Sequence, residues 1–328
     1  MTRGYCMENQ LTVTNNSDAQ IIGMFLDTKS RRSRTTADVY SGVINEFFKY
    51  VEYKAFSAIT YADLVDYSNY LAHPDPYRDP VVLAVSTQNR KIATIKSLFK
   101  YAFKIGYIPF NPAEPLETQR VDHKIAQRIL SDDELLAIIL AAQRKSLAHL
   151  LMVYFLACTG CRESELAQLM WRNFFIGPGG EICVSITGKG NKTRVLKIVP
   201  SLWDIIVAYR EAEGLTSKID PRNKSAFIPN RFGNNYSRQT IWKMVKECVE
   251  TSGISKNASP HWLRHTYATS VAQDETANLW RLQHDMGHAA ISTTQGYVHI
   301  ARGMKDTSVD HVGYLHQIEK NIFSSHES

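Results

Sequence analysis

The sequence predicts a mainly helical fold with one small β-hairpin or sheet, an α+β protein built from two domains. Apolar residues recur at helical spacing along most of the chain, whereas one stretch alternates apolar and polar residues on both sides of a glycine-containing turn. The length of 328 residues favours two domains, because single hydrophobic cores stop growing beyond about 250–300 residues.

The N-terminal part is expected to be a helical bundle covering residues 17–118, after a flexible N-terminus at 1–16. Apolar spacing and helix-starting residues predict helices at 17–29, 36–53, about 61–72 and 86–105. Thr60 can cap the third of these helices, with Asp63 in its first turn.

Three prolines between residues 109 and 115, and the polar residues after them, indicate a linker and a domain boundary near residue 120. We place the linker at 119–130 and the second domain at 131–328. Ser131 and Glu134 make a capping-box pattern at its first helix. Its expected helices are 131–144, 147–158, 162–169, 201–212, 238–250, 261–272 and 276–286, and its expected hairpin joins strands 181–187 and 193–199.

Composition narrows the class of protein. The formal net charge is +6, which is compatible with a phosphate-rich partner but is weak support alone. Five cysteines are an odd number in a long chain and do not indicate a disulfide framework. Cys158 and Cys161 form a C-x-x-C without a second pair, so we interpret them as small buried residues rather than a zinc site. No apolar run reaches the roughly 20 residues of a membrane span, and a cytoplasmic protein is expected.

Four short segments of the second domain carry residues suited to phosphate chemistry. They are Thr159–Leu166 with Arg162, the turn Gly188–Lys192 with Lys189, His261–His265 with Arg264, and Met286–His299 with His288 and Tyr297. In this order, these residues resemble the catalytic motifs of the tyrosine recombinase family, the phage integrases and Xer-like enzymes. The spacing between His288 and Tyr297 also matches that family. The N-terminal bundle is similar, less specifically, to the family's SAM-like core-binding domain, and the second domain is similar to its catalytic domain.

The resemblance implies a site-specific DNA recombinase, or integrase, that cuts and rejoins DNA through a covalent bond between Tyr297 and a phosphate. Attack would leave a 3′-phosphotyrosine and a free 5′ hydroxyl. No metal or other cofactor is expected, because the covalent link holds the bond energy. His261 and His265 have the spacing of a metal-binding pair, but Arg264 would repel a cation, so we interpret His265 as structural.

Arg162 and Arg264 are the candidates for gripping the nonbridging phosphate oxygens, which gather more charge in the transition state. The phenol of Tyr297 has an unperturbed pKa of about 10, so it needs help to lose its proton. His261 is the candidate base, because histidine exchanges protons at working pH. His288 is expected to hydrogen-bond the scissile phosphate.

The leaving 5′ oxygen needs a proton, and Lys189 at the hairpin turn is the expected donor. Lys192 lies on the same loop and stays open as the alternative. Glu165 lies about one helical turn from Arg162 and is expected to orient either Arg162 or His261.

Double-stranded DNA is the expected partner. Lys96, Lys100 and Lys104 form a basic stripe that is typical of a solvated helix face, but in a DNA-binding protein it would face phosphates, as would Lys192. The resemblance further implies a homotetramer on two DNA sites and a nucleoid-associated location.

The little chain before residue 17 leads us to expect no separate arm-binding domain. A helix at about 312–323 is expected to dock into a neighbouring protomer or to pack on its own domain; the sequence leaves both open. The target DNA sequence, the biological role, and the need for an accessory DNA-bending protein or a partner recombinase also stay open.

Two alternatives use the same type of fold. One is a type IB topoisomerase-like activity on a single duplex, which the compact two-domain layout does not favour. The other is a catalytically inactive DNA-binding regulator, against which the intact set of six candidate residues speaks.

Overall fold

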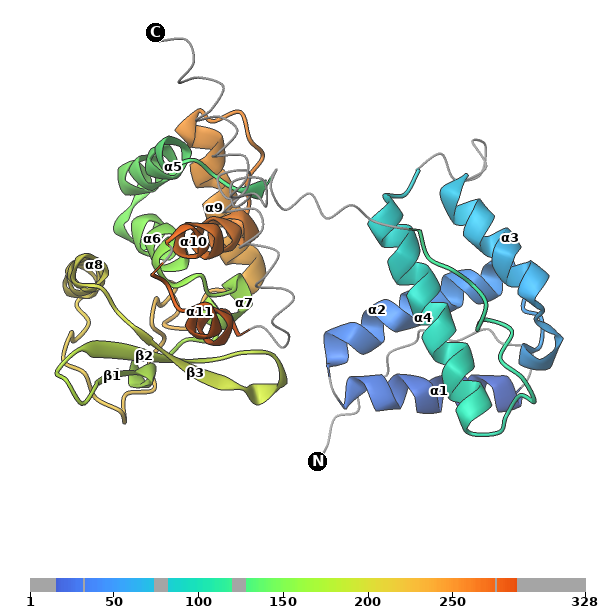
Figure 1. Ribbon diagram of the computed structural model, residues 1–328. Coiled ribbons are helices and arrows are strands. Elements are labelled where there is room, and N and C mark those ends of the chain that lie inside the picture. Colours follow the sequence, from blue (N-terminus) through green and yellow to red (C-terminus); the bar gives the residue numbers. More distant parts are fainter. Residues whose placement is uncertain (1–15, 32, 74–81, 120–127, 275, 288–328) are drawn as a thin grey trace, which may run out of the picture. The chain divides into compact units, whose positions relative to one another are not determined.

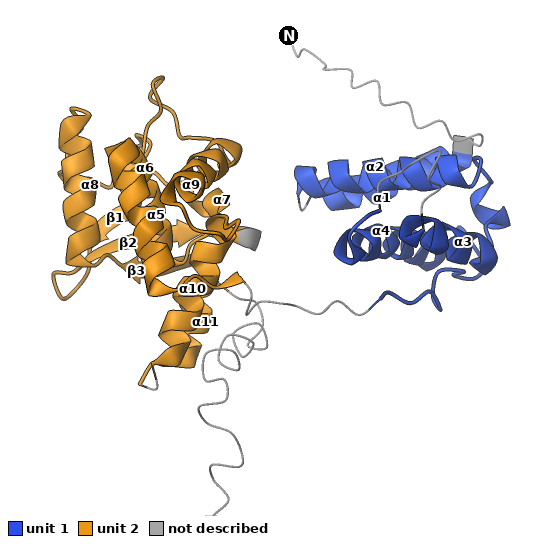
Figure 2. Cartoon of the chain, turned by 90° about the horizontal axis from the view of Figure 1, so that it is seen from above, with its two compact units in different colours: residues 1–123 blue, residues 124–328 orange. Residues whose placement is uncertain are grey.

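The computed structural model of the protein describes residues 16–31, 33–73, 82–119, 128–274 and 276–287. The chain divides into two compact units, residues 1–123 and 124–328 (Figure 2). Of the flexible N-terminus predicted at 1–16, only Asn16 is described, and it begins a helix. The C-terminal helix predicted at about 312–323 lies outside the described residues.

Unit 1 is a helical bundle, and its described helices follow the predicted order (Figure 1). They are α1 (Asn16–Ser30), α2 (Arg34–Tyr50), α3 (Tyr61–Ala72) and α4 (Val85–Lys104), with a 3₁₀ turn at Phe56–Ala58. The cap predicted for α3 is present as a complete capping box. The Asp63 N–H donates to Thr60 Oγ1 at 3.3 Å, and Thr60 N–H donates back to Asp63 Oδ2 at 2.8 Å.

Aromatic rings join the helices of unit 1. The Phe47 ring on α2 lies 5.0 Å from that of Tyr67 on α3 and 6.2 Å from that of Phe99 on α4. The proline-containing segment after α4 contributes Ala113 and Leu116 to the same buried core. This segment therefore packs as part of unit 1.

The described part of unit 2 combines helices with one small sheet (Figure 1). Its helices are α5 (Asp132–Lys145), α6 (Leu147–Thr159), α7 (Glu163–Leu166), α8 (Pro200–Ala212), α9 (Arg238–Ser252), α10 (Pro260–Gln273) and α11 (Leu279–Met286). Its strands are β1 (Phe174–Ile176), β2 (Ile182–Thr187) and β3 (Thr193–Lys197), all antiparallel in the order β1-β2-β3.

Helix α6 lies at the centre of unit 2. It packs against α5, α8, α9 and α10, and it is apolar nearly all round, as a buried helix must be. Ser131 caps α5 in the predicted capping box with Glu134. The sheet lies along one side of these helices, and α11 packs beside β3 (Figure 1).

The observed elements confirm the predicted α+β fold, and three of the differences from the prediction lie in unit 2. The hairpin is part of a three-stranded sheet, because Phe174–Ile176 pairs with β2. This strand was not predicted, because three residues are too few to show the alternation of apolar and polar residues. Helix α7 stops at Leu166, since Gln168 and Leu169 donate to carbonyls three residues back and the chain then enters the core. Helix α11 starts only at Leu279, where the Asn278 side chain caps it.

Among the described residues, none of the helices combines the length and the apolar character needed to cross a lipid bilayer.

Candidate active site

The site begins where α6 ends. Gly160 adopts a left-handed conformation with φ of +59°, and its N–H closes the helix on the Leu156 carbonyl. A Cβ atom at this position would lie 2.4 Å from a ring carbon of Tyr267 on α10. Glycine therefore permits both the turn and the close approach of α10, and the turn delivers Arg162 to the start of α7.

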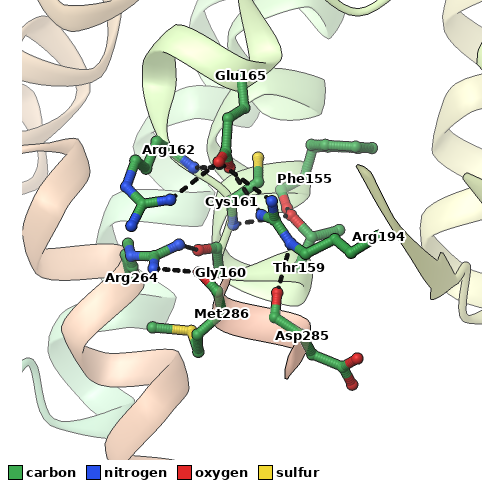
Figure 3. Close-up of polar contacts among 10 residues, drawn as sticks. All are labelled: Phe155, Thr159, Gly160, Cys161, Arg162, Glu165, Arg194, Arg264, Asp285 and Met286. Atoms are coloured by element: carbon green, nitrogen blue, oxygen red, sulfur yellow. Dashed lines mark hydrogen bonds and ion pairs between the residues drawn. The ribbon is translucent and has the colours of Figure 1, made fainter. Parts of the chain in front are cut away.

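Glu165 is the buried acceptor of this site (Figure 3). Its carboxylate accepts the Arg162 N–H and Arg162 Nη1, both at 2.9 Å. It also accepts Arg194 Nη1 at 3.1 Å and Nη2 at 2.7 Å. Burial opposes the charged form, but the bonds from Arg194 and Arg162 outweigh it and hold the pKa of Glu165 below its ordinary value. Of the two orientation partners expected for Glu165, the structure places Arg162 against it.

The Arg264 guanidinium joins two helix ends. It is buried and donates through Nη1 to the Gly160 carbonyl at 2.6 Å and through Nη2 to the Met286 carbonyl at 2.5 Å (Figure 3). These carbonyls belong to the ends of α6 and α11, which lack helical partners. Arg264 thus connects the segment that carries Arg162 with the segment that leads to His288.

His261 lies on the first turn of α10 and is exposed. The surrounding protein still removes enough water to lower the pKa of its imidazole, and the positive charges of Arg264, Arg162 and Arg128 lower it further, while Glu163 opposes them. The ring stands edge-on to the buried ring of His265, with centroids 4.4 Å apart.

The hairpin turn packs against the same carboxylate. A Cβ atom at Gly188 would lie 2.8 Å from Glu165 Oε1, so the turn comes close to Glu165 because glycine stands there. Lys189 follows in the 3₁₀ turn Lys189–Asn191, and its side chain lies outside what the structure describes. Lys192 is exposed just before β3.

The end of α11 completes the described part of the site. Gly287 has a φ of +61°, and a Cβ atom there would lie 3.3 Å from Arg194 Nη1 and 3.8 Å from Arg162 Nη1. His288 follows directly, but it and Tyr297 lie outside the described residues. The described structure thus gathers Arg162, Glu165 and Arg264 with the segments next to Lys189 and His288.

Arg194 was missed by the sequence analysis. A signal was available, because residues 194, 196 and 198 share one face of the strand and its continuation, and the other two are the apolar Leu196 and Ile198. A charge on the buried face of an amphipathic strand requires a partner.

The predicted DNA-contacting lysines of α4 differ in their surroundings. Lys100 and Lys104 are exposed. The Lys96 ammonium donates to the Glu114 carbonyl at 3.2 Å and also to the Leu116 carbonyl. Lys96 therefore helps to hold the segment that follows α4.

The two cysteines of the C-x-x-C are free thiols. Burial raises the pKa of Cys158 to about 11 and that of Cys161 to about 12, which disfavours the reactive thiolate. Among the described residues, no group of His, Cys, Asp and Glu is arranged to hold a metal ion.

Comparison with known proteins identifies the family of the chain. Residues 128–303 match the phage integrase family. The chain belongs to this family. Residues 22–121 also match the phage integrase SAM-like domain. Both matches confirm the family and the domain types that the motifs predicted.

The curated proteins similar to this chain include several that are named tyrosine recombinase XerD. The protein from Oceanobacillus iheyensis is 32% identical over 227 residues, which cover 68% of this chain and 74% of the relative. The protein from Staphylococcus saprophyticus is 28% identical over 284 residues, with coverages of 85% and 92%. The chain is accordingly a site-specific DNA recombinase, an enzyme that cleaves and rejoins DNA, and the topoisomerase-like and inactive alternatives are not favoured.

Solved structures share the fold of this integrase. A lambda integrase dimer bound to a COC′ core site has a TM-score of 0.66 at 17% identity, covering 88% of this chain and 80% of the other. XerH recombinase bound to a palindromic difH substrate also has a TM-score of 0.66, at 18% identity, with coverages of 90% and 88%. A lambda integrase tetramer bound to a Holliday junction has a TM-score of 0.64 at 16% identity, with coverages of 88% and 84%.

Proposed function

We propose that this recombinase breaks one DNA strand by attack of the Tyr297 phenol on a phosphate. The phosphorus–oxygen bond to the 5′ oxygen breaks, and a 3′-phosphotyrosine and a 5′ hydroxyl form. A 5′ hydroxyl from the partner strand then attacks the phosphotyrosine and releases Tyr297. The observation that carries this proposal is the meeting of Arg162 and Arg264 beside the segments that precede Lys189 and His288.

Arg162 and Arg264 are suited to hold the nonbridging oxygens. Arg162 is 31% exposed, so its guanidinium can receive a ligand while Glu165 fixes one side of it. Arg264 is fixed by two carbonyls, and a guanidinium carries five N–H donors. Donors that are fixed before the reaction stabilise the developing charge without having to reorganise.

Proton transfer falls to the remaining candidates. His261 has a lowered pKa, which favours the neutral imidazole that can accept the Tyr297 proton. Lys189 is proposed to protonate the leaving 5′ oxygen, with Lys192 as the alternative on the same turn. His288 is proposed to hydrogen-bond the phosphate.

Double-stranded DNA is the proposed partner, with four protomers on two sites. Support comes from the similar lambda integrase and XerH structures, which are DNA complexes and include a tetramer on a Holliday junction. Lys100, Lys104 and Lys192 are exposed and are proposed to contact phosphates. Lys96 would have to exchange its two carbonyl partners for a phosphate to join them. A cytoplasmic, nucleoid-associated location is proposed because the substrate is DNA.

The test is covalent trapping by wild type and Tyr297→Phe. The target site is first found by mapping protein–DNA adducts in cells that produce the wild type. A duplex with this sequence is then made with a nick next to the cleavage position, so that the cleaved end diffuses away and the adduct cannot be reversed. Wild type is expected to accumulate a covalent adduct. Tyr297→Phe is expected to bind the duplex with unchanged affinity and to form none, because phenylalanine lacks the nucleophilic oxygen.

Tyr314→Phe is the matched control, since it removes a hydroxyl from the same C-terminal part of the sequence. If Tyr314→Phe loses the adduct and Tyr297→Phe keeps it, the nucleophile has been assigned to the wrong tyrosine.

A further inference from the structure

The Arg194 guanidinium lies buried where three segments of unit 2 meet (Figure 3). Its side chain is 4% exposed. Nε donates to the Asp285 carbonyl at the end of α11, at 2.6 Å, and both Nη atoms donate to the Glu165 carboxylate on α7. Arg194 itself stands on β3, directly after the hairpin turn. One side chain therefore bonds α7 and α11 to the hairpin.

Two glycines pack around this guanidinium. A Cβ atom at Gly188 would lie 3.4 Å from Arg194 Nη1, and one at Gly287 would lie 3.3 Å from the same atom. The distance at Gly287 is tighter than ordinary van der Waals contact, and the one at Gly188 is at its lower limit. The missing side chains thus let the hairpin turn and the end of α11 approach the guanidinium. The residues that follow these glycines are Lys189 and His288.

The charges at this site give Arg194 a second effect. Glu165 is 3% exposed and accepts from two guanidiniums, so the three side chains together carry one net positive charge. Arg194 is nearly as buried as Glu165, whereas Arg162 is 31% exposed. Arg194 therefore compensates the buried carboxylate, and the charge of Arg162 is left available to a ligand. Without Arg194, the carboxylate would be compensated by Arg162 alone.

We propose that Arg194 is a positioning residue of the recombinase. It holds Glu165 so that Arg162 is oriented but not neutralised, and it seats the segments that lead to Lys189 and His288. This inference rests on the function proposed for Arg162, Lys189 and His288. Arg194 acts through these residues and does not itself contact the DNA.

The test compares cleavage of two substrates that differ in the charge of the scissile phosphate. One carries the natural phosphodiester, and the other a methylphosphonate, in which a methyl group replaces one nonbridging oxygen and removes the negative charge. Arg194→Met is expected to slow single-turnover cleavage of the phosphodiester by about ten-fold or more, as for loss of a preorganised charge, with little change in DNA affinity. The deficit is expected to be smaller on the methylphosphonate, because less charge has to be compensated.

Glu165→Gln in the Arg194→Met background provides a second readout. This change removes the carboxylate that would neutralise Arg162, so the phosphodiester rate is expected to recover in part. A purely structural role of the buried pair predicts further loss instead. Arg281→Met is the matched control, because Arg281 is an exposed arginine on α11 that contacts the Asp285 side chain; it is expected to cleave both substrates like wild type.

Arg194→Lys keeps the experiment decisive if Arg194→Met does not fold. Lysine retains the charge but cannot bond two carboxylate oxygens and a carbonyl in one plane, so it is expected to compensate Glu165 only in part. The deficit should be smaller than in Arg194→Met and should still be larger on the phosphodiester than on the methylphosphonate. Equal deficits on both substrates, or wild-type rates, would overturn the inference. Loss of cleavage in Arg162→Ala and Tyr297→Phe with normal cleavage in the Arg194 variants would refute this inference alone. Normal cleavage in Arg162→Ala and Tyr297→Phe would refute the proposed function.

Discussion

Arg264 holds together two helix ends that are far apart in the sequence. Its Nη atoms donate to Gly160 and Met286, which lie 104 and 22 positions away. The same guanidinium is proposed to bind the scissile phosphate. A residue with both tasks should affect folding and catalysis together, which separates it from a residue that acts on only one of them.

Arg264→Ala is therefore expected to lower the free energy of unfolding as well as to abolish cleavage. Each buried carbonyl left without a donor costs about 1–3 kcal/mol, so we expect a loss of roughly 2 kcal/mol or more in urea unfolding. Arg264→Lys, which retains a cation but loses the fork, should recover part of the stability and little of the cleavage rate. Unchanged stability in Arg264→Ala would contradict the two-carbonyl anchor.

His261 gives the reaction a predicted dependence on pH. Its pKa is lowered from an ordinary value of 6.5 by desolvation and by Arg264, Arg162 and Arg128. The imidazole is thus mostly neutral at pH 7, and the midpoint of its protonation lies below pH 6.5. The single-turnover cleavage rate should fall at acid pH, with the midpoint of the fall below pH 6.5.

Glu163→Gln offers a control for this assignment, because Glu163 is the nearby acid that opposes the lowering. Its removal should move the acid limb of the rate profile to still lower pH. A limb that lies above pH 6.5, or that does not move in Glu163→Gln, would show that another group controls the profile.

Several helices in both units begin at side-chain caps. In α5, the Glu134 carboxylate accepts the Ser131 N–H at 2.8 Å and the Lys256 ammonium at 2.7 Å. Lys256 also donates to the Ile129 carbonyl. The α5 capping box is therefore bonded to a lysine distant in the sequence, whereas the Thr60–Asp63 box of α3 is bonded to nearby Lys54.

Ser131→Ala is expected to reduce the free energy of unfolding of unit 2 by about 1 kcal/mol, the usual cost of losing a helix cap. Glu134→Ala should cost more, because it also removes the partner of Lys256. Urea unfolding followed by circular dichroism measures both changes. Thr60→Ala is the matched cap variant in unit 1. If Glu134→Ala were no worse than Ser131→Ala, the Lys256 contact would contribute nothing.

At the scale of the whole molecule, the described residues form two large hydrophobic cores, and each draws its residues from one unit. The core of unit 1 lies between Ile22 and Leu116, and the core of unit 2 between Leu130 and Leu263. The small cluster of α10 and α11 belongs entirely to unit 2. A unit with its own core should fold without the other.

We expect fragments 1–123 and 124–328 each to unfold cooperatively in urea, with the circular dichroism spectrum of a folded protein. The fragments should together reproduce the helical signal of the full chain. A fragment without a cooperative transition would show that its core needs the other unit. Neither fragment is expected to bind DNA as tightly as the whole chain or to cleave it as well, because the DNA contacts proposed for α4 and for unit 2 would be separated.

Much of this architecture was predictable because its signals are local. The 3.6-residue spacing of apolar residues located the helices, and Thr60 and Ser131 located two of their starts. The order of Arg162, Lys189, His261, Arg264, His288 and Tyr297 indicated the family. Strand β1 escaped prediction because three residues have no measurable alternation, and its partner is chosen only when β2 is in place.

The amino-acid sequence alone indicated which residues are suited to phosphate chemistry, which segments are helical and to which enzyme family the chain belongs. Only the tertiary structure decided the partners of the buried charges. Glu165 and Arg194 are 29 positions apart, and Arg264 and Gly160 are 104 apart. Helical spacing and caps act within one or two turns, whereas a buried guanidinium takes whichever acceptors the packed core brings within hydrogen-bonding distance, and no local pattern records that choice.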